Sequence, residues 1–350
     1  MHGQALASEV FLKDIETNHQ VTVVNTAKKK ASGIWDKIFR NFEVVGILIK
    51  TLRSLSKTDL IYLTISESIF GNIKDILTYT ICFSKLDRMV IHLHGGAGMA
   101  NIMKPNKILA SLNSFFIRRL KGVVVLGDTH KKIFQGITHD SKIHIVPNFS
   151  EDYLFLDQDE IIAKFNPTNP NLNILFLSNL LPGKGYLELL EAFVSLPDSY
   201  KKKIKINFAG GFASDVLKRD FLNRIKDESN IHYHGVVKGK QKRELFAASQ
   251  VFCLPTYYPF EGQPISILES YATGCAVITT NHSGIRDIFT PGINGFEVIK
   301  GSVDSIRSML MEIHDKSSEL SIMGIKNWET AHKKFRTSIY NRSLREIVGL

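Results

Sequence analysis

Several features that define large protein classes are scarce or missing in this sequence. It has three cysteines in 350 residues, Cys82, Cys253 and Cys275, with no CxxC spacing. Cysteines so placed predict neither a disulfide framework nor a zinc site, and they favour buried thiols in a reducing cytoplasm. The longest apolar run near position 45, Val44–Ile49, has six residues, far fewer than the roughly 18–20 of a membrane span. We expect no signal or transit peptide, because Met1–Gln4 has the pattern of neither.

Nucleic-acid-binding signatures are also missing, since no zinc-finger or RRM pattern occurs, and there is no internal repeat or low-complexity segment. The chain is 44% hydrophobic and 10% aromatic, which with its length suits two globular domains. Its net charge of +10 is uneven: residues 1–150 carry 20 Lys and Arg against 11 Asp and Glu, whereas residues 151–350 carry 24 against 23. The basic first half therefore predicts an anionic partner, such as a charged substrate or lipid, and no nucleic acid.

A pair of carboxylates is the most informative pattern. Glu261 and Glu269 flank seven residues, and Pro264 suits the first turn of a helix. Glu261 then lies in the loop before that helix and Glu269 about 7.5 Å along it, at about 1.5 Å per residue. The free N–H groups of the helix start bind phosphate well. This layout suits a phosphorylated polyol, although it also fits two solvated glutamates beside an ordinary helix cap.

Apolar strands surround this pattern. The strands predicted at Val251–Leu254 and Ala276–Thr280 make a βαβ unit with the helix between them, so the loop lies at the carboxyl edge of a parallel sheet. A second strand–loop–helix follows Asn173–Ser178, and its loop ends in Lys184, an arrangement that binds phosphate without being a Walker A motif. Further strands are predicted at His19–Val24, Asp59–Thr64, Met89–His94, Val123–Leu126, Ile143–Asn148, Ile204–Gly211 and Ile231–Val237.

Residues 34–57 have helical spacing of apolar side chains, from Ile34 to Leu52, with basic residues around them that begin at Lys28–Lys30. Such a basic amphipathic helix is typical of segments that rest on membranes. The same pattern also fits a helix packed on its own sheet with a solvated basic rim.

Residues 254–280, LPTYYPFEGQPISILESYATGCAVITT, resemble the E-x7-E region of retaining nucleotide-sugar glycosyltransferases of family 4, which build bacterial capsule, O-antigen and other surface glycans. The resemblance implies an α/β GT-B fold, with two Rossmann-like parallel-sheet domains facing a cleft. Residues 1–150 would form the acceptor-side domain, 151–170 a linker and 171–325 the nucleotide-sugar domain. Residues 326–350 would be helices that cross back to the first domain.

The implied activity is transfer of a sugar from a nucleotide-sugar donor to a hydroxyl of a glycan or lipid-linked acceptor, with retention and without a metal or other cofactor. By the resemblance, Glu269 binds the ribose, Glu261 and His94 contact the donor sugar, and Lys184 neutralises the diphosphate. The enzyme would be cytoplasmic or peripheral on the inner membrane face. The other residues that the resemblance places around the donor are Asn179, Gly183, Gly210, Val236, Val237, Gly262, Gln263, Pro264 and Ile265.

The sequence departs from the family at three points. Asn179 stands where an arginine is usual, and Ser283 replaces one glycine of a Gly-Gly-Ile loop. Gly3 and Gln4 look like the loop near acceptor or phosphate, but the strand that should precede them is missing. A partner subunit that binds nucleotide without turnover, and a GT-B epimerase or hydrolase, therefore remain alternatives.

Two patterns resemble metal-binding motifs, but we do not interpret either as a metal site. His92 and His94 alternate onto one face of a strand, but no third ligand is evident. Asp157-Gln-Asp159 is a DxD, the metal-binding sign of the other large glycosyltransferase fold. It falls in the acidic linker without the buried strand that should precede it, so we interpret it as solvated.

Overall fold

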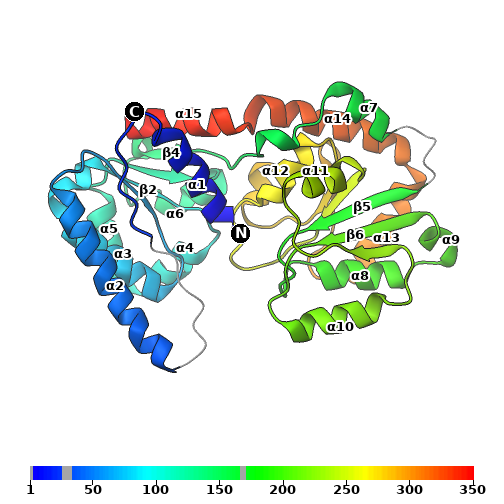
Figure 1. The fold of residues 1–350 in the computed structure, drawn as a ribbon, viewed down its shortest axis with the longest axis horizontal. Helices are drawn as coiled ribbons and strands as arrows, with labels where there is room; N and C mark the ends of the chain where they lie inside the picture. Colours follow the sequence, from blue (N-terminus) through cyan, green and yellow to red (C-terminus); the bar gives the residue numbers. More distant parts are fainter. Residues whose placement is uncertain (1–2, 26–33, 166–170) are drawn as a thin grey trace. The chain divides into compact units, whose positions relative to one another are not determined.

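The chain folds into two compact units, each built on a parallel sheet (Figure 1). The computed structural model describes residues 3–25, 34–165 and 171–350. Unit 1 comprises residues 1–147 and 341–350, and unit 2 comprises residues 148–340. Each unit has its own cluster of buried apolar side chains, so each has a separate hydrophobic core.

The sheet of unit 1 has four strands in the order β1-β2-β3-β4, all parallel. Its two central strands are buried throughout and read as apolar runs, as expected where helices cover both faces of a parallel sheet. β1 lies at the edge of the sheet. The strands are β1 (Ile61–Thr64), β2 (Met89–His92), β3 (Gly122–Val125) and β4 (Ile143–Ile145).

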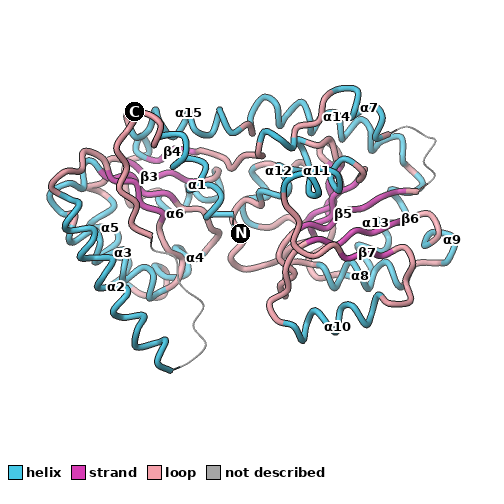
Figure 2. Tube along the Cα trace, in the orientation of Figure 1, coloured by secondary structure: helices cyan, strands magenta, loops and turns pink. Residues whose placement is uncertain are grey.

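Two of the longer helices of unit 1, α3 and α5, begin at side-chain caps. Ser68 accepts a hydrogen bond from the N–H of Gly71, and Asn106 accepts one from Leu109. Helices α2, α3 and α5 lie side by side (Figure 2). The helices are α1 (Gly3–Ile15), α2 (Ile34–Leu55), α3 (Ile69–Ile81), η1 (Phe83–Arg88), α4 (Gly98–Met103), α5 (Lys107–Ile117), α6 (Asp128–Phe134) and η2 (Asp140–Lys142), together with the end of α15 (Thr337–Val348).

The strand predicted for His19–Val24 is wrong. Residues 20–25 form neither helix nor strand, and Val21 and Val23 are exposed. In the described part of unit 1, no strand precedes β1. An extended segment needs a paired neighbouring strand for its N–H and C=O groups, and among the described residues no strand pairs with this one.

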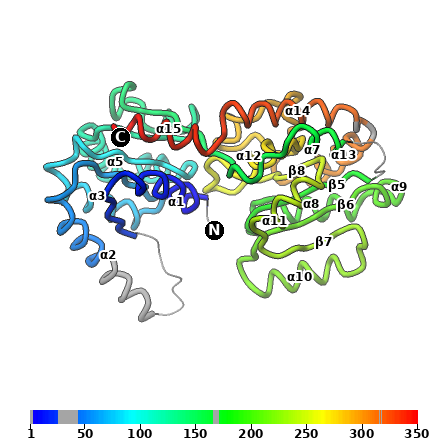
Figure 3. The backbone as a smooth tube through the Cα atoms, turned by 45° about the horizontal axis from the view of Figure 1, so that its top comes forward, coloured from blue at the N-terminus to red at the C-terminus, as the bar shows by residue number. Residues whose placement is uncertain are grey.

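The sheet of unit 2 has six parallel strands in the order β10-β9-β8-β5-β6-β7. Helices α8 and α10 lie on one side of it and α12 and α14 on the other, which Figure 3 shows from a second direction. The strands are β5 (Leu172–Leu177), β6 (Ile204–Ala209), β7 (Ile231–Tyr233), β8 (Val251–Leu254), β9 (Ala276–Thr279) and β10 (Gly295–Glu297). The helices are η3 (Asp152–Leu154), α7 (Gln158–Lys164), α8 (Tyr186–Val194), α9 (Asp198–Lys201), α10 (Asp215–Ile225), α11 (Gly239–Ala247), α12 (Ile265–Ala272), η4 (Ser283–Asp287), α13 (Val303–Asp315) and α14 (Ser317–Lys334), followed by the start of α15.

The segment predicted as a linker, residues 151–170, contains η3 and α7. Asp157 caps α7 in a capping box, because its Oδ1 accepts from the N–H of Glu160 at 2.8 Å and Glu160 Oε2 accepts from the N–H of Asp157 at 2.9 Å. The first aspartate of the DxD pattern therefore has a helix-capping role. Pro167 and Pro170, two of the signals for a linker, lie outside the described residues.

Helix α2 carries exposed apolar side chains. Val45, Ile49 and Leu52 follow one another at helical spacing and are 52%, 44% and 59% exposed. The predicted basic run Lys28–Lys30 lies outside the described residues, as do the side chains of residues 34–43. Across the described ranges, every helix is too short or too polar to cross a membrane.

Candidate functional site

The loop between β5 and α8 is shaped by glycines. Gly183 and Gly185 have φ angles of +85° and +87°, a region that costs a residue with a side chain energy. A Cβ on Gly185 would lie 2.6 Å from the carbonyl oxygen of Pro255, and the N–H of Tyr257 donates to the carbonyl of Gly183 at 2.7 Å. The predicted phosphate loop is therefore fixed against the segment that follows β8.

This packing brings two of the predicted catalytic residues into contact. Lys184 Nζ lies 2.6 Å from Glu261 Oε2, and both side chains are about nine-tenths buried. Thr256 Oγ1 donates to the same oxygen at 3.0 Å, and the Lys184 ammonium lies 4.8 Å from the ring centroid of Tyr258. Both polar contacts use Oε2, so among the described residues Oε1 of Glu261 has no partner. The pair thus presents a cation and a carboxylate oxygen within one small region.

The loop before α12 is hydrogen-bonded to Asn148, the first residue of unit 2. The backbone N–H of Asn148 donates to Gln263 Oε1 at 2.7 Å, and Asn148 Nδ2 donates to the carbonyl of Gln263 at 2.8 Å. Both residues are buried. The side-chain oxygen of Gln263 therefore accepts a hydrogen bond within the protein. We call this pair of hydrogen bonds between Asn148 and Gln263 the clamp, because it fixes the loop before α12. The helix starts at Ile265 with Pro264 as its N-cap, one residue later than predicted.

The serine that replaces a glycine adopts a glycine-like conformation. Ser283 has a φ of +47°, the only positive φ of a non-glycine residue in the described ranges. Its hydroxyl donates to the carbonyl of Glu261 at 2.5 Å, and the N–H of Gly284 donates to the carbonyl of Gly262 at 3.0 Å. These bonds hold the backbone of Glu261 and Gly262 against the segment that follows β9.

The second carboxylate has partners that the sequence analysis missed. Glu269 is 2% exposed, and its Oε1 forms a short ion pair with Lys242 of α11. Lys242 also lies 3.8 Å from Glu151 Oε2. Burial raises the pKa of Glu269, whereas the charge and hydrogen bond of Lys242 lower it. In the sequence, Lys242 looks like its neighbours Lys238 and Lys240, so no local signal identified it.

The loop that carries Val236 and Val237, which the resemblance places around the donor, meets Gly210 at the end of β6. The N–H of Gly210 donates to the carbonyl of Gly235 at 2.7 Å. A Cβ on Gly210 would lie 1.8 Å from the carbonyl oxygen of Ser178, so only glycine fits there. Val236 is 63% exposed and Val237 is buried. Backbone from three strand ends therefore converges here.

In unit 1, His92 and His94 stack with their ring centroids 3.8 Å apart. His92 Nδ1 lies 2.5 Å from the hydroxyl of Tyr62, and neither ring nitrogen of buried His94 has a partner among the described residues. Burial lowers the pKa of His94 to about 3, so the ring is neutral near pH 7. No group of three or more His, Cys, Asp or Glu suited to a metal occurs in the described ranges.

None of the contacts above involves the predicted site residues Gly3, Gln4 and Asn179. Gly3 and Gln4 form the exposed first turn of α1, so the prediction that they form a loop is wrong. Asn179 follows β5 at the start of the predicted phosphate loop and is partly buried.

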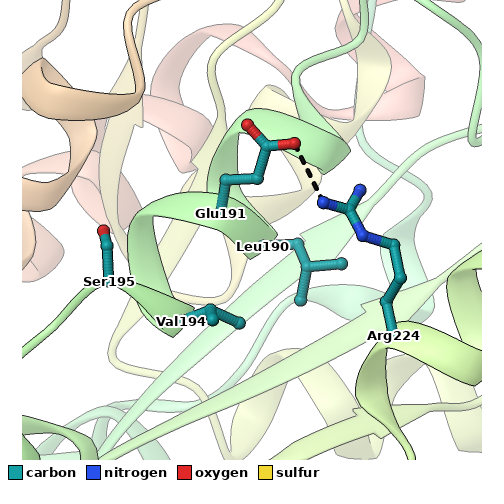
Figure 4. Close-up of a pocket in the computed structure, with 5 residues that line it drawn as sticks. All are labelled: Leu190, Glu191, Val194, Ser195 and Arg224. Carbon is teal, nitrogen blue, oxygen red and sulfur yellow. Dashed lines mark hydrogen bonds and ion pairs between the residues drawn. The ribbon is translucent and has the colours of Figure 1, made fainter.

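A hollow of about 300 Å³ between α8 and α10 contains none of the predicted site residues, and an ion pair of 3.0 Å between Arg224 and Glu191 spans it (Figure 4). A surface depression closed by an exposed ion pair offers little for recognition, so we do not assign the site there.

Comparison with known proteins bears on the same part of the chain. The sequence model of the family Glycosyl transferases group 1 matches residues 157–327. An uncharacterized glycosyltransferase of Methanocaldococcus jannaschii is 22% identical over 174 residues, which cover 47% of this chain and 44% of that protein. O-antigen chain mannosyltransferase B of Escherichia coli is 27% identical over 140 residues, which cover 39% and 35%. The matched segment spans less than half of either relative.

Solved structures resemble most of the chain. Anabaena HepE in complex with UDP and glucose has a TM-score of 0.67 and 16% identity, over 87% of this chain and 81% of that one. Sucrose-phosphate synthase from Thermosynechococcus elongatus has a TM-score of 0.66 and 13% identity, over 87% and 78%. These similarities confirm the predicted α/β GT-B fold.

Proposed function

We propose that this chain is a glycosyltransferase that moves a sugar from a nucleotide-sugar donor to a hydroxyl, with retention of configuration. The observation that carries the proposal is the buried Lys184–Glu261 pair at 2.6 Å, between a glycine-shaped loop and the start of α12. The family match over residues 157–327 includes both residues and supports the assignment. HepE, solved with UDP and glucose, shares the fold.

In this proposal the bond between the anomeric carbon and the diphosphate oxygen breaks, and a bond to the acceptor oxygen forms on the same face. The acceptor proton passes to the departing diphosphate oxygen, so no covalent enzyme intermediate is needed. Lys184 and the N–H groups at the start of α12 stabilise the negative charge that develops on the diphosphate, which is commonly the largest catalytic contribution. Glu261 Oε1 faces the positive charge that develops at the sugar.

Two further residues complete the donor-side assignment. Glu269 accepts hydrogen bonds from the ribose hydroxyls, and neutral His94 bonds a sugar hydroxyl. The main chain at Val236 and Val237 contacts the base edge. No resident metal or other cofactor takes part in this scheme.

We further propose an acceptor on a membrane surface, in surface-glycan assembly on the inner face of the membrane. The name of the Escherichia coli relative points to that setting. Helices α2, α3 and α5 lie together on one side of unit 1 (Figure 1), and with η1 they carry exposed apolar side chains. The exposed basic residues on these elements or beside them are Lys50, Arg53, Lys57, Lys104 and Lys107. The exposed apolar side chains are Val45, Ile49, Leu52, Ile69, Phe70, Ile73, Leu77, Phe83, Ile108, Leu112 and Phe115.

Cosedimentation with vesicles tests this surface. The chain should bind vesicles that contain phosphatidylglycerol more tightly than phosphatidylcholine vesicles, and a Val45→Ser, Ile49→Ser, Leu52→Ser variant should bind weakly. Ile322→Ser is the control, because Ile322 is 70% exposed in unit 2. Equal binding by wild type and the triple variant would show that α2 takes no part in membrane binding.

The enzyme assignment is tested with a panel of UDP-, GDP-, ADP- and dTDP-sugars, read by thermal shift and by sugar release. One nucleotide should stabilise the wild type and not Glu269→Ala. Binding without turnover would favour the partner-subunit alternative. Turnover that is complete without any acceptor would favour an epimerase or hydrolase.

A further inference from the structure

Lys242 is buried where a surface helix would be expected to present a solvated lysine. Its side chain is 11% exposed, whereas Lys240, two residues earlier on α11, is 91% exposed. The Lys242 ammonium pairs with Glu269 Oε1 and lies 3.8 Å from Glu151 Oε2. Burying the charges of Lys242 and Glu269 costs solvation that a surface pair does not, so the arrangement is not accounted for by stability.

The groups around Glu269 have opposing effects on its charge. Burial and the carboxylate of Glu151 raise the pKa of Glu269, and Lys242 is the group that lowers it. Tyr153 also faces this cluster, and its pKa is raised by burial and by the charges of Glu151 and Glu269. Without Lys242, Glu269 would be a buried carboxyl beside another negative charge, which favours its neutral form.

The ion pair engages only one oxygen of the Glu269 carboxylate. The ion pair uses Oε1 of Glu269, and Oε2 makes no hydrogen bond to the described residues. A carboxylate has several lone-pair directions, so Oε2 can accept hydroxyl protons while Oε1 stays on Lys242. Hydrogen bonds to a charged acceptor are about twice as strong as neutral ones.

We propose that Lys242 is a positioning residue that keeps the Glu269 carboxylate charged and aimed at the ribose hydroxyls of the donor nucleotide. This inference rests on the proposed function and deepens it, since it adds a residue on α11 to the nucleotide subsite. Lys242 acts through Glu269 and need not touch the donor. Glu151 holds the ammonium from the other side.

Calorimetric titration of UDP, GDP, ADP and dTDP between about pH 6 and pH 9 tests the proposal. The nucleotide that binds wild type should bind Lys242→Met about tenfold or more weakly at the lower pH, and affinity should recover as pH rises, because Glu269 then ionises without its partner. Lys242→Arg should restore most of the affinity at the lower pH. Lys240→Met, on the same helix, should bind like wild type at every pH.

A double variant separates positioning from support of the fold. If Lys242 acts through the charge of Glu269, then Glu269→Gln and the double variant with Lys242→Met should bind nucleotide equally weakly, without dependence on pH. The double variant buries no unpaired charge at residue 269. If Lys242→Met alone does not fold, the double variant can therefore still be compared with Glu269→Gln. An additive loss in the double variant would overturn the proposal.

The possible failures are distinguishable. If wild type binds none of the four nucleotides, the proposed function fails and the inference fails with it. If wild type binds a nucleotide and Lys242→Met binds it equally at each pH, the function stands and the role of Lys242 is wrong. A lower melting temperature with unchanged affinity would assign Lys242 to the fold alone.

Discussion

Each unit is built on its own parallel sheet, and the two differ in how the polar groups beyond the strand ends are paired. In unit 2, polar groups beyond the strands bond to one another, as Glu261 does with Lys184 and Thr256. In unit 1, His94 follows β2 with two buried ring nitrogens that have no partner in the described chain. These polar groups of unit 2 are therefore already paired, whereas His94 of unit 1 has ring nitrogens that a ligand would have to satisfy. This contrast supports the proposal that unit 2 recognises the donor.

Replacing Glu261 should produce the largest effect and is the strongest challenge to this contrast. Glu261→Gln keeps the shape and the contact with Thr256 but removes the charge beside Lys184. Turnover of the donor found in the panel should fall by about 10²–10³. Glu319→Gln, an exposed glutamate of α14, is the control. Turnover within a factor of about two of wild type would exclude a catalytic role for Glu261.

Gly210 tests whether the close approach of strand ends in unit 2 is required. In Gly210→Ala, the new Cβ would lie 1.8 Å from the carbonyl oxygen of Ser178, at a φ of +139°. The free energy of unfolding should fall by about 2–5 kcal/mol in urea titration. Gly292→Ala, at a φ of +78° with no atom within 4 Å, should cost about 1 kcal/mol. Equal losses would show that strain of φ alone governs both positions.

Lys164 tests how unit 2 tolerates a buried charge. Its ammonium donates to the carbonyls of Phe246, at 2.9 Å, and Thr273, at the ends of α11 and α12. Lys164→Met should lower the free energy of unfolding by about 2–4 kcal/mol, because it removes both hydrogen bonds. The Phe246 carbonyl keeps the N–H of Ser249 at 3.2 Å, whereas the buried Thr273 carbonyl has no other donor among the described residues. Exposed Lys202→Met should change it by less than about 0.5 kcal/mol. A stability near wild type would mean that water replaces the ammonium.

Acid should destabilise unit 1 more than unit 2, and we expect this effect to be smaller than that of Gly210→Ala or Lys164→Met. Burial lowers the pKa of His92 and His94 below the ordinary value of 6.5. The unfolded chain therefore binds protons first as pH falls through 6.5, and unit 1 loses stability down to the folded pKa. At about pH 5.5 the two histidines together should cost about 2–3 kcal/mol. Hydrogen exchange of β2 and β3 should show this loss. That of β5 and β8 should change less, because His234 and His332, whose pKa is also lowered in unit 2, are only partly buried.

His94→Gln provides the control for the acid effect. The slope of stability against pH in unit 1 should become shallower in this variant, since one of the two buried rings no longer titrates. A parallel loss of protection in both units at the same pH would contradict the assignment to the histidines.

Sequence-based prediction failed in different ways in the two units. The four strands of unit 1 and five of the six strands of unit 2 were predicted, and Gly183 and Pro264 marked the loop geometry of unit 2 directly. β10 (Gly295–Glu297) was missed, since three residues carry too little periodicity. In unit 1, residues 19–24 alternate as a strand does, but alternation cannot show whether a neighbouring strand exists.

Lys242 shows why part of the site was not predictable. Three lysines lie close together at residues 238–242, and only packing decides which one faces Glu269. The clamp between Asn148 and Gln263 was missed for a related reason, because 115 residues separate the partners. Neither contact leaves a local pattern in the sequence.

The clamp of Asn148 on Gln263 also bears on the order of folding. Closing a contact across 115 residues costs chain entropy that local helices and turns do not. During synthesis Asn148 emerges long before Gln263, so its two hydrogen bonds cannot form until the next 115 residues have been made. The loop before α12 should therefore be among the last parts to become ordered. Nucleotide binding in refolding experiments would then report completion of the domain rather than its early collapse.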